Sequence, residues 1–239
     1  MSWVTDPNGG FSVVTGVAYR LGMTDTTLAR MRVDYQTSGF DVDQLAPTWH
    51  EQLAAWLAEA EEAGVAEPNA MVLATADPAG RPASRTVLCK GLDERGVVFF
   101  TNFTSAKSQD LRQSHEASAT FPWYPLHRQA HVRGIVQQTS YAEADAYWAT
   151  RPRGSQLGAW ASAQSAVVAD RSVLDQALAD VERRFADTEV VPRPPHWGGW
   201  RIVPDEVEFW QGRTDRMHDR LRFVGDRDTR TWKVIRLAP

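Results

Sequence analysis

Two cationic side chains stand two positions apart near the end of the chain, close to an aromatic one. In EFWQGRTDRMHDRLRF, which runs from Glu208 to Phe223, Arg216 and His218 follow Trp210. Side chains two apart on a strand project from the same face, so a strand here would bring both cations together. Such a pair favours a bound anion, and Trp210 would form an aromatic wall beside it. The stretch predicts a site for a flat, phosphorylated molecule; a charged strand edge facing solvent is the alternative.

Two cationic clusters lie earlier in the chain. In RTVLCK, Arg85 and Lys90 belong to a predicted strand whose strict alternation places them on opposite faces. A ligand shared by both requires a bulge, a twist or a strand end; otherwise they are ordinary surface charges. In FTNFTSAKSQDL, Ser105 and Lys107 precede or open a short helix, whose free amides and dipole suit a phosphate. An ordinary N-cap beside a solvated lysine is the equal alternative.

A third cluster occupies YWATRPRGSQLGAWASAQS. Tyr147, Arg151 and Ser155 recur at intervals of four, which a continuous helix would bring to one side. The proline after Arg151 predicts that the helix breaks there and presents an arginine and a serine at its end. Gln164 and Ser165 add neutral donors. The pattern indicates a second anion site, and a helix–loop surface over packed tryptophans explains it equally well.

The composition argues against several other classes of protein. The 239 residues carry a formal net charge of −4, which gives no support for non-specific nucleic-acid binding. The patterns GxGxxG and HExxH and a P-loop are absent, and the six histidines are scattered, so no metal site is expected. A single cysteine excludes an intramolecular disulfide. No apolar run reaches the roughly 18 residues that span a bilayer, and no signal-peptide pattern is present. We expect a cytoplasmic protein that binds neither membrane nor nucleic acid.

The elements that must position these clusters are mostly short strands. β-Branched and aromatic runs alternate with turn sequences such as DPAGRP and DERG, which are short enough to join antiparallel neighbours. Many short strands with tight turns and a few outer helices favour a closed antiparallel barrel. The predicted strands cover residues 70–77, 84–93, 96–102, 117–124, 128–140, 199–203, 206–212, 220–224 and 231–237.

Helices are predicted from caps and apolar stripes. Thr48 with Glu51 and Ser140 with Glu143 have the spacing of capping boxes. The predicted helices cover residues 47–64, 140–148, 155–162 and 172–187. Residues 1–30 are rich in Gly, Thr, Ser and Asp without a sustained period, so we expect a flexible lead followed by a single domain over residues 31–239.

Taken in order, these stretches resemble the pyridoxamine 5′-phosphate oxidase family. The resemblance runs from about Arg32 to the final RLAP and rests on PNAMVLAT, RTVLCK, FPWYPLHRQAHVRG, RPRGSQLGAWASAQS, WGGWRI and EFWQGRTDRMHDR. It implies a mainly β fold with flanking helices: an FMN-binding split antiparallel β-barrel, homodimeric, with FMN at the subunit interface. It also implies oxidation of pyridoxamine or pyridoxine 5′-phosphate to pyridoxal 5′-phosphate by hydride transfer from C4′ to flavin N5, with dioxygen reduced to hydrogen peroxide.

The resemblance also assigns residues by motif. Contacts with FMN are implied for Arg85, Thr86, Val87, Leu88, Cys89, Lys90, Phe100, Thr101, Lys107, Gln129, Gln164, Ser165, Trp210 and Arg220. Contacts with the substrate are implied for Arg32, Tyr35, Lys90, Tyr147, Arg151, Ser155, Arg216 and His218. Arg216 and His218 are the implied catalytic pair over the substrate ring. Arg213 and Arg222, in the same stretch, are expected to face solvent.

The chain departs from the family pattern at two positions. Ala106 stands where many members carry an arginine before the lysine, and Phe100 replaces a tyrosine. Cys89 is expected to be a small buried residue in a strand and not a redox centre. Three alternatives stay open: a split-barrel oxidoreductase using flavin, deazaflavin or haem on another substrate, a non-catalytic flavin or pyridoxal-phosphate binding module, and an interaction protein.

Overall fold

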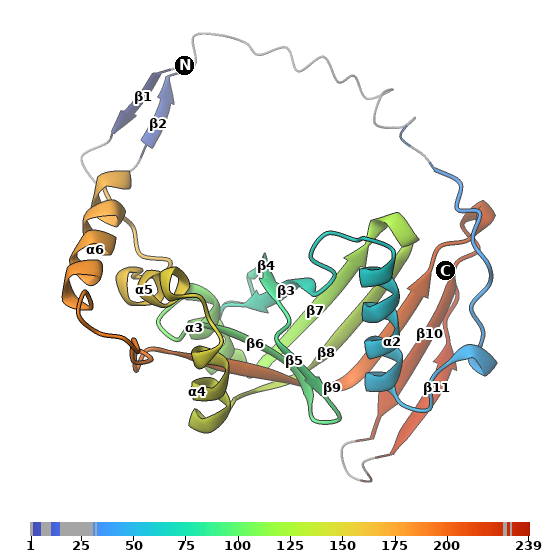
Figure 1. Cartoon of the computed structure of the whole chain (residues 1–239). Coiled ribbons are helices and arrows are strands. Elements are labelled where there is room, and N and C mark those ends of the chain that lie inside the picture. Colours follow the sequence, from blue (N-terminus) through green and yellow to red (C-terminus); the bar gives the residue numbers. More distant parts are fainter. Residues whose placement is uncertain (1, 6–10, 15–30, 32, 227–228, 230) are drawn as a thin grey trace.

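A nine-stranded antiparallel sheet dominates the computed structural model, which describes residues 2–5, 11–14, 31, 33–226, 229 and 231–239. The strands follow the order β11–β10–β9–β8–β7–β3–β4, and β6 pairs with both β9 and β5 (Figure 1). They are β3 (Ala70–Ala76), β4 (Pro82–Leu88), β5 (Gly91–Asp93), β6 (Gly96–Asn102), β7 (Glu116–Trp123), β8 (Arg128–Gln138), β9 (Trp197–Gln211), β10 (Asp219–Gly225) and β11 (Trp232–Arg236). The mainly β fold with flanking helices is confirmed.

The barrel is split between β4 and β6. The ladder runs β4–β3–β7–β8–β9–β6, so a closed barrel would require β4 and β6 to pair, and among the described residues they do not. The chain leaves β4 after Leu88, the backbone N–H of Lys90 donates to the Val98 carbonyl (2.8 Å), and β5 then pairs with β6. The predicted strand 84–93 is therefore two strands with different partners. The expectation of a closed barrel is wrong, and the split barrel that the resemblance implied is confirmed.

One long strand, β9, pairs with three other strands of the sheet. The sequence predicted two strands in this region, but Trp197–Gln211 is continuous. Its first half pairs with β6 and its second half with β10, while β8 pairs with it from Trp200 to Gln211. The register shifts between Arg133 and Gly134, where a Cβ on Gly134 would lie 2.0 Å from the Val203 carbonyl oxygen. Glycine at this bulge lets the ladder continue beyond it.

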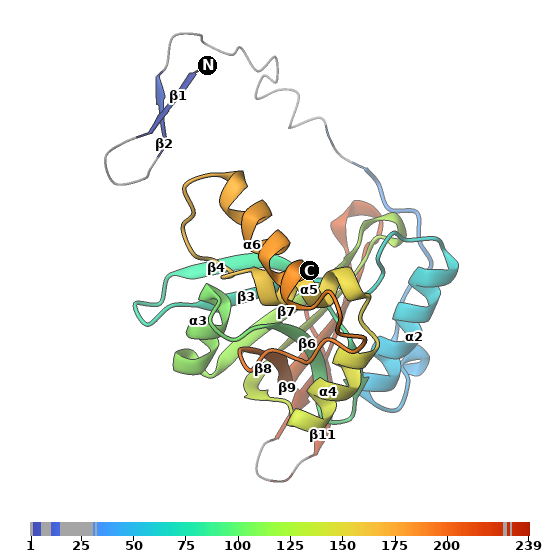
Figure 2. The ribbon, with the colours of Figure 1, turned by 60° about the vertical axis from the view of Figure 1, so that its left-hand side comes forward.

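The helices lie around the sheet, with α4, α5 and α6 toward one end and α2 covering the other (Figure 1, Figure 2). They are α2 (Trp49–Glu62), α3 (Ala106–Ser114), α4 (Tyr141–Ala149), α5 (Arg153–Ala161) and α6 (Arg171–Arg184). The capping box at Ser140 and Glu143 is present in both directions, whereas Thr48 caps α2 and donates its hydroxyl to the Glu51 carboxylate. Within the described residues, no helix has the length and apolar character needed to cross a membrane.

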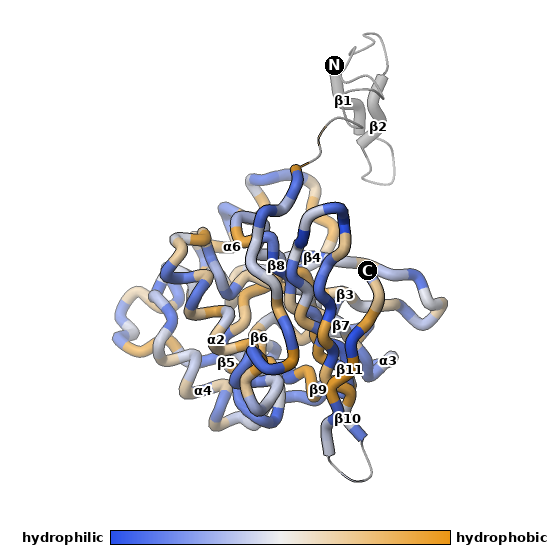
Figure 3. The backbone as a smooth tube through the Cα atoms, turned by 90° about the vertical axis from the view of Figure 1, so that its right-hand side faces the viewer, coloured by the Kyte–Doolittle hydropathy of each residue, from blue (hydrophilic) through white to orange (hydrophobic). Residues whose placement is uncertain are grey.

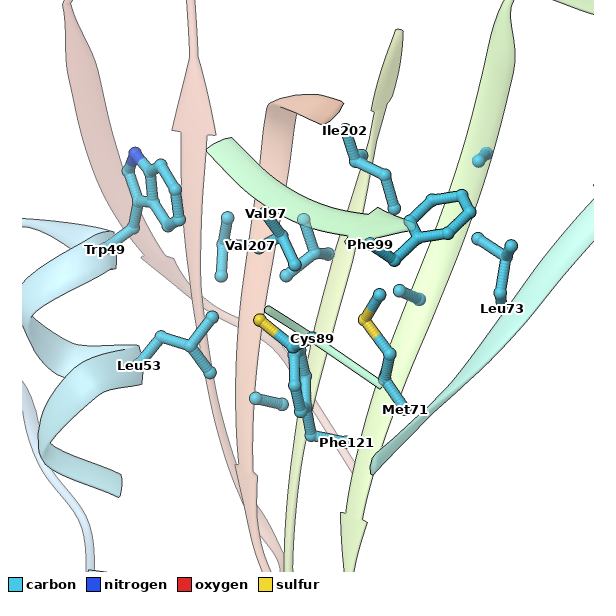
Figure 4. Close-up of a cluster of buried hydrophobic side chains, with 14 of the residues drawn as sticks. Trp49, Leu53, Met71, Leu73, Cys89, Val97, Phe99, Phe121, Ile202 and Val207 are labelled. Carbon is cyan, nitrogen blue, oxygen red and sulfur yellow. The ribbon is translucent and has the colours of Figure 1, made fainter. Parts of the chain in front are cut away.

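The core lies between α2 and the inner face of the sheet. Trp49 and Leu53 of α2 point toward Cys89, Phe121 and Val207 of the sheet (Figure 4). Buried side chains alternate with more exposed ones along β3 and β7, and the hydropathy along the tube changes repeatedly within the strands (Figure 3). Strand side chains that are not buried in this core are the ones that can line a site.

The N-terminal residues contain two short strands that were not predicted. β1 (Ser2–Thr5) and β2 (Phe11–Val14) pair antiparallel in a sheet of their own. The rest of the expected flexible lead, residues 1, 6–10 and 15–30, lies outside the described residues.

Candidate functional site

Most of the predicted site residues line two cavities near opposite ends of β9. The basic cavity, about 400 Å³, is lined by Arg85, Thr86, Val87, Leu88, Lys90, Phe100, Thr101, Lys107, Tyr147, Arg151 and Gln164. The aromatic cavity, about 500 Å³, is lined by Met31, Val33, Asp34, Tyr35, Trp210, Arg213, Asp215, Arg216 and His218. Trp197 begins β9 beside the first and Trp210 nearly ends it beside the second, so about 40 Å of strand separates them at roughly 3.3 Å per residue.

The end of β4 brings Arg85 and Lys90 to the same cavity, although alternation predicted opposite faces. β4 ends at Leu88, and the turn of the chain toward β6 redirects Lys90. Arg85 is fixed by a hydrogen bond from its guanidinium to the Thr75 hydroxyl (2.7 Å). Because β4 ends between Arg85 and Lys90, one ligand can contact both side chains.

The beginning of α3 holds Lys107 among neutral oxygens. Its ammonium group lies 3.2 Å from the Thr101 hydroxyl and 3.0 Å from the Gln164 side-chain oxygen. Burial and the nearby charge of Arg85 both lower the pKa of Lys107. No Asp or Glu is among the residues that line this cavity. The positive charge is thus available to a bound anion.

The N-cap of α3 is not an ordinary one. The Ser105 side chain does not cap the helix and donates instead to the Asn102 carbonyl (2.7 Å). The first amide of the helix, that of Ala106, donates to the Ser165 hydroxyl (3.2 Å). Ser165, with a left-handed φ of 75°, therefore lies at the helix start beside Lys107 and Gln164.

The break between α4 and α5 occurs at the proline, as predicted. Arg151 lies in this break, with its guanidinium 4.8 Å from the Trp197 ring centre and donating to the Ser155 carbonyl (2.8 Å). It is also hydrogen-bonded to Tyr147, and burial lowers its pKa. Its Nε is buried and has no partner among the described residues. A buried guanidinium donor without a partner is a costly arrangement unless a ligand accepts from it.

Phe100, one of the two departures, is stacked between aromatic neighbours. Its ring lies 4.2 Å from that of Tyr147 and 5.4 Å from that of Trp197. A further cavity of about 340 Å³ adjoins the basic cavity through Phe100 and Arg151, and Ser155 lines it. The residues at the break between α4 and α5 (Tyr147, Arg151 and Ser155) and those at the end of β4 (Arg85 and Lys90) therefore line one continuous region.

The turn that carries Arg216 and His218 is not a strand. Residues Thr214–Arg216 form a short 3₁₀ turn, in which Asp215 and Arg216 have φ values of 54° and 60°. The same-face reasoning for a strand was wrong, because this left-handed turn precedes β10. Both side chains nevertheless line the aromatic cavity.

Aromatic rings surround His218. Its ring centre lies 4.6 Å from that of Trp210 and 5.9 Å from that of Tyr35, which stacks on His127 at 4.2 Å. The Arg213 backbone N–H donates to His218 Nδ1 (3.0 Å). Burial and the charge of Arg216 lower the pKa of His218. Arg32, predicted to lie close by, is outside the described residues.

Gln129, Trp210 and Arg220 are direct cross-strand neighbours on β8, β9 and β10. None of the three lines the basic cavity. Arg220 forms a two-point ion pair with Glu208 (2.8 and 3.1 Å), and Arg222 also contacts Glu208 (2.7 Å).

The expectation that Arg213 and Arg222 face solvent is wrong. Arg222 is tied to Glu208, and Arg213 pairs with Asp219 (3.0 Å). The sequence offered a signal for both, because each carboxylate lies within the same stretch as its arginine.

Cys89 differs from the other predicted contacts. Its side chain lies in the core, where burial raises the pKa of the thiol to about 11, and it does not line the basic cavity (Figure 4). Its backbone N–H donates to the Asn69 carbonyl (2.9 Å) and its carbonyl accepts from the Asn69 side-chain amide (2.9 Å), so the FMN contact implied for Cys89 stays a prediction. The expectation of a small buried residue is confirmed, but its placement in a strand is wrong, because β4 ends at Leu88 and β5 begins at Gly91.

Comparison with known families matches most of the chain. Residues 57–185 match the family model described as pyridoxamine 5′-phosphate oxidase. Residues 197–239 match the one described as the pyridoxine 5′-phosphate oxidase C-terminal dimerisation region. The second match includes β9, β10 and β11 and the turn of the aromatic cavity.

Individual relatives agree with these matches. The chain is 62% identical over 214 residues to a pyridoxine/pyridoxamine 5′-phosphate oxidase of Saccharopolyspora erythraea, covering 89% of this chain and 96% of the relative. It is 55% identical to another of Mycolicibacterium paratuberculosis, covering 91% and 99%. Among solved structures, it is similar to PhzG of Burkholderia lata in complex with tetrahydrophenazine-1-carboxylic acid, with 35% identity, a TM-score of 0.74 and coverage of 84% and 100%.

Proposed function

The chain belongs to the pyridoxine/pyridoxamine 5′-phosphate oxidase family, and we propose that it is an FMN-dependent oxidase of this kind. It converts pyridoxamine and pyridoxine 5′-phosphate to pyridoxal 5′-phosphate and reduces dioxygen to hydrogen peroxide. The observation that carries this proposal is the basic cavity, where four cations converge without an acidic residue in the lining. Phosphate groups are the anions that such a surface recognises best.

The basic cavity fits the phosphate end of FMN. The start of α3, Lys107, Thr101 and Arg85 offer an amide-rich, positively charged end, and Lys107 has no acidic contact there. The β4 segment from Arg85 to Lys90, with Gln164 and Ser165, would line the remainder of FMN. When bound, FMN accepts the hydride that leaves C4′ of the substrate and passes the electrons to dioxygen.

The substrate would be held at its two ends. Lys90, Tyr147, Arg151 and Ser155 bind its phosphate, and the unpartnered Nε of Arg151 supports this role. At the other end His218 holds the ring hydroxyl, and Arg216 orients the substrate and favours loss of its proton. Tyr35 and Arg32 would cover the bound ring. These residues position a reacting carbon, which is how a protein assists a cofactor that carries the difficult chemistry.

The two ends of the proposed site come from two subunits. In one chain the basic and aromatic cavities are separated by the length of β9, so neither holds both ends of the substrate alone. The match of residues 197–239 to a dimerisation region supports an arrangement in which the partner's aromatic cavity faces the basic cavity. Gln129, Trp210 and Arg220 would then complete the FMN site from the partner. Residues 31–239 act as one domain in this homodimer.

The proposal includes a cytoplasmic location and no metal requirement. Cys89, buried with a raised pKa, is consistent with a reducing compartment because it forms no disulfide.

Anaerobic mixing tests the proposed function directly. Purified protein loaded with FMN should lose its yellow absorbance when pyridoxamine 5′-phosphate is added, and regain it when dioxygen is admitted. Tetrahydrophenazine-1-carboxylic acid, the ligand of the Burkholderia lata relative, is tested in parallel as the alternative substrate, because it is a carboxylic acid without phosphate. Bleaching by that acid alone would favour another split-barrel oxidase, and binding of FMN without bleaching by either would favour a binding module.

A further inference from the structure

One carboxylate near the aromatic cavity connects three separate segments. The Asp219 side chain, 15% exposed at the start of β10, accepts from the Phe40 backbone N–H (3.1 Å) and the Arg213 guanidinium (3.0 Å) through Oδ2. Its Oδ1 accepts from Arg236 of β11 (2.8 Å). Asp219 does not line the cavity, so it is not a ligand contact. Its position suits it to hold other residues in place.

The Arg213–Asp219 ion pair closes the turn that carries Arg216 and His218. Two successive residues of this turn, Asp215 and Arg216, have left-handed φ values, which L-residues keep only where the surroundings enforce them. The ion pair joins the two ends of the turn and supplies such a constraint.

The closed turn also fixes the chemistry of His218. The Arg213 backbone N–H donates to His218 Nδ1 (3.0 Å), so a neutral His218 carries its proton on Nε2. Nε2 is then a hydrogen-bond donor, as an anionic or polar ring substituent requires. Movement of Arg213 would remove the bond that selects this tautomer.

The same ion pair contacts the segment that carries Tyr35. Phe40 donates to Asp219, and the Thr37 hydroxyl donates to the Gly212 carbonyl at the start of the turn. A Cβ on Gly39 would lie 2.5 Å from the Arg213 guanidinium, so this backbone rests directly against the ion pair. Tyr35 precedes these anchors and lies over His127, beside His218.

We propose that Asp219 is a positioning residue that acts through His218. Through its contacts with Arg213 and Phe40, Asp219 fixes the turn from Arg213 to His218 relative to the segment that carries Tyr35. In this geometry the His218 Nε2 proton is directed toward the ligand. The inference rests on the proposed function, since it concerns binding and oxidation at the same site.

A matched pair of variants tests it. Asp219→Asn removes the charge with little change in shape. Asp93→Asn is the control, because Asp93 also accepts from two arginines, Arg95 and Arg201, and from one backbone N–H, but at β5, away from both cavities. For each variant we would measure the FMN dissociation constant and the rate of anaerobic flavin reduction by pyridoxamine 5′-phosphate, alone and combined with His218→Ala.

We expect Asp219→Asn to slow flavin reduction by about tenfold while the FMN dissociation constant stays within about twofold. Added to His218→Ala, it should slow the reaction by no more than about threefold, because the part of its effect that acts through His218 is gone and only its hold on the rest of the turn and on the Tyr35 segment remains. Asp93→Asn should leave the rate within about twofold in both backgrounds. Equal losses from Asp219→Asn in both backgrounds, or no loss in either, would overturn the proposal.

Misfolding of the Asp219→Asn variant and failure of the proposed function itself can each be recognised separately. If Asp219→Asn does not fold, Arg213→Met replaces it in the same cycle, since Asp219 then keeps Phe40 and Arg236 and loses only the ion pair. The same non-additivity with His218→Ala is expected, and additive losses would again overturn the proposal. A parent enzyme that binds FMN but is not reduced by the substrate overturns the proposed function, and this inference with it.

Discussion

The basic cavity and the aromatic cavity treat their cations in opposite ways. In the basic cavity Lys107 contacts a hydroxyl and an amide oxygen, and Arg151 contacts a backbone carbonyl. In the aromatic cavity Arg213 is paired with a carboxylate, and Asp34 and Asp215 are part of the lining. The first therefore keeps positive charge for a ligand to neutralise. The second is closer to balance, and we expect it to recognise a ring mainly by stacking and by one directed N–H.

The two cavities are also built differently. The basic cavity lies at the end of a strand and at the ends of two helices, whose positions local sequence determines. The aromatic cavity depends on a left-handed turn held by Asp219 and by contacts with Phe40, more than 170 residues earlier in the chain. The proposed function assigns attraction of phosphate and orientation of the reacting ring to these separate regions, so different variants should affect them separately.

Arg216→Ala is expected to give the largest difference between its effect on turnover and its effect on FMN binding. Loss of the residue that orients the substrate should lower kcat/KM on the order of 10²–10³-fold, since misplacement and loss of proton-transfer assistance each have effects of this size. The FMN dissociation constant, measured by flavin fluorescence, should change by less than about threefold, because Arg216 does not line the basic cavity. Equal losses of flavin and turnover would contradict the division of roles.

Mixed dimers test whether the cavities act across subunits. Arg151→Met should by itself lower kcat/KM on the order of 10²-fold, through loss of a charge-assisted contact with the substrate phosphate. A dimer of one Arg216→Ala chain and one Arg151→Met chain would contain one intact site and one doubly altered site. After unfolding and co-refolding of equal amounts, random pairing should restore about a quarter of parental activity, by the symmetry of a two-fold dimer. Activity no higher than the mean of the two variants would place both cavities of a site in one chain.

Local sequence signals predicted the basic cavity better than the aromatic cavity. The turn at DPAGRP, the capping box at Ser140 and the proline after Arg151 each act within a few residues, and the structure has the element that each indicated. The continuity of β9 and the role of Asp219 depend on partners far away in the chain, which a single sequence does not display. Pro204 and Asp205 read as a turn, yet opposite the bulge at Gly134 they remain in the strand.

A smaller effect is expected from Lys107→Met, which tests the charge of the basic cavity alone. Removal of one charge-assisted contact with phosphate should weaken FMN binding by about tenfold or slightly more. At saturating FMN, kcat should stay within about twofold of the parent, because Lys107 lies away from the aromatic cavity. Lys233→Met, at an exposed lysine of β11, is the control and should leave FMN affinity unchanged. Similar weakening by both variants would show that net charge, and not the cavity, attracts the cofactor.

The smallest effect concerns stability beside the aromatic cavity. Burial works to raise the pKa of Glu208, but hydrogen bonds and charges from Arg220 and Arg222 outweigh it and hold the pKa below its usual value. A carboxyl with a lowered pKa stabilises the fold above its unfolded pKa, and this stabilisation is lost as the pH falls through the folded value. Glu208→Gln should therefore cost about 1–2 kcal/mol at pH 7, and the difference from the parent should shrink below about pH 4.

Urea unfolding at pH 7 and pH 3, at fixed protein concentration, measures this difference. Glu206→Gln is the matched control, since Glu206 contacts Arg222 but not Arg220 and should cost less. A Glu208→Gln penalty that is independent of pH would mean that its shape, and not its charge, supports this side of β9. The carboxylate would then have no part in the charge balance that distinguishes the aromatic cavity from the basic one.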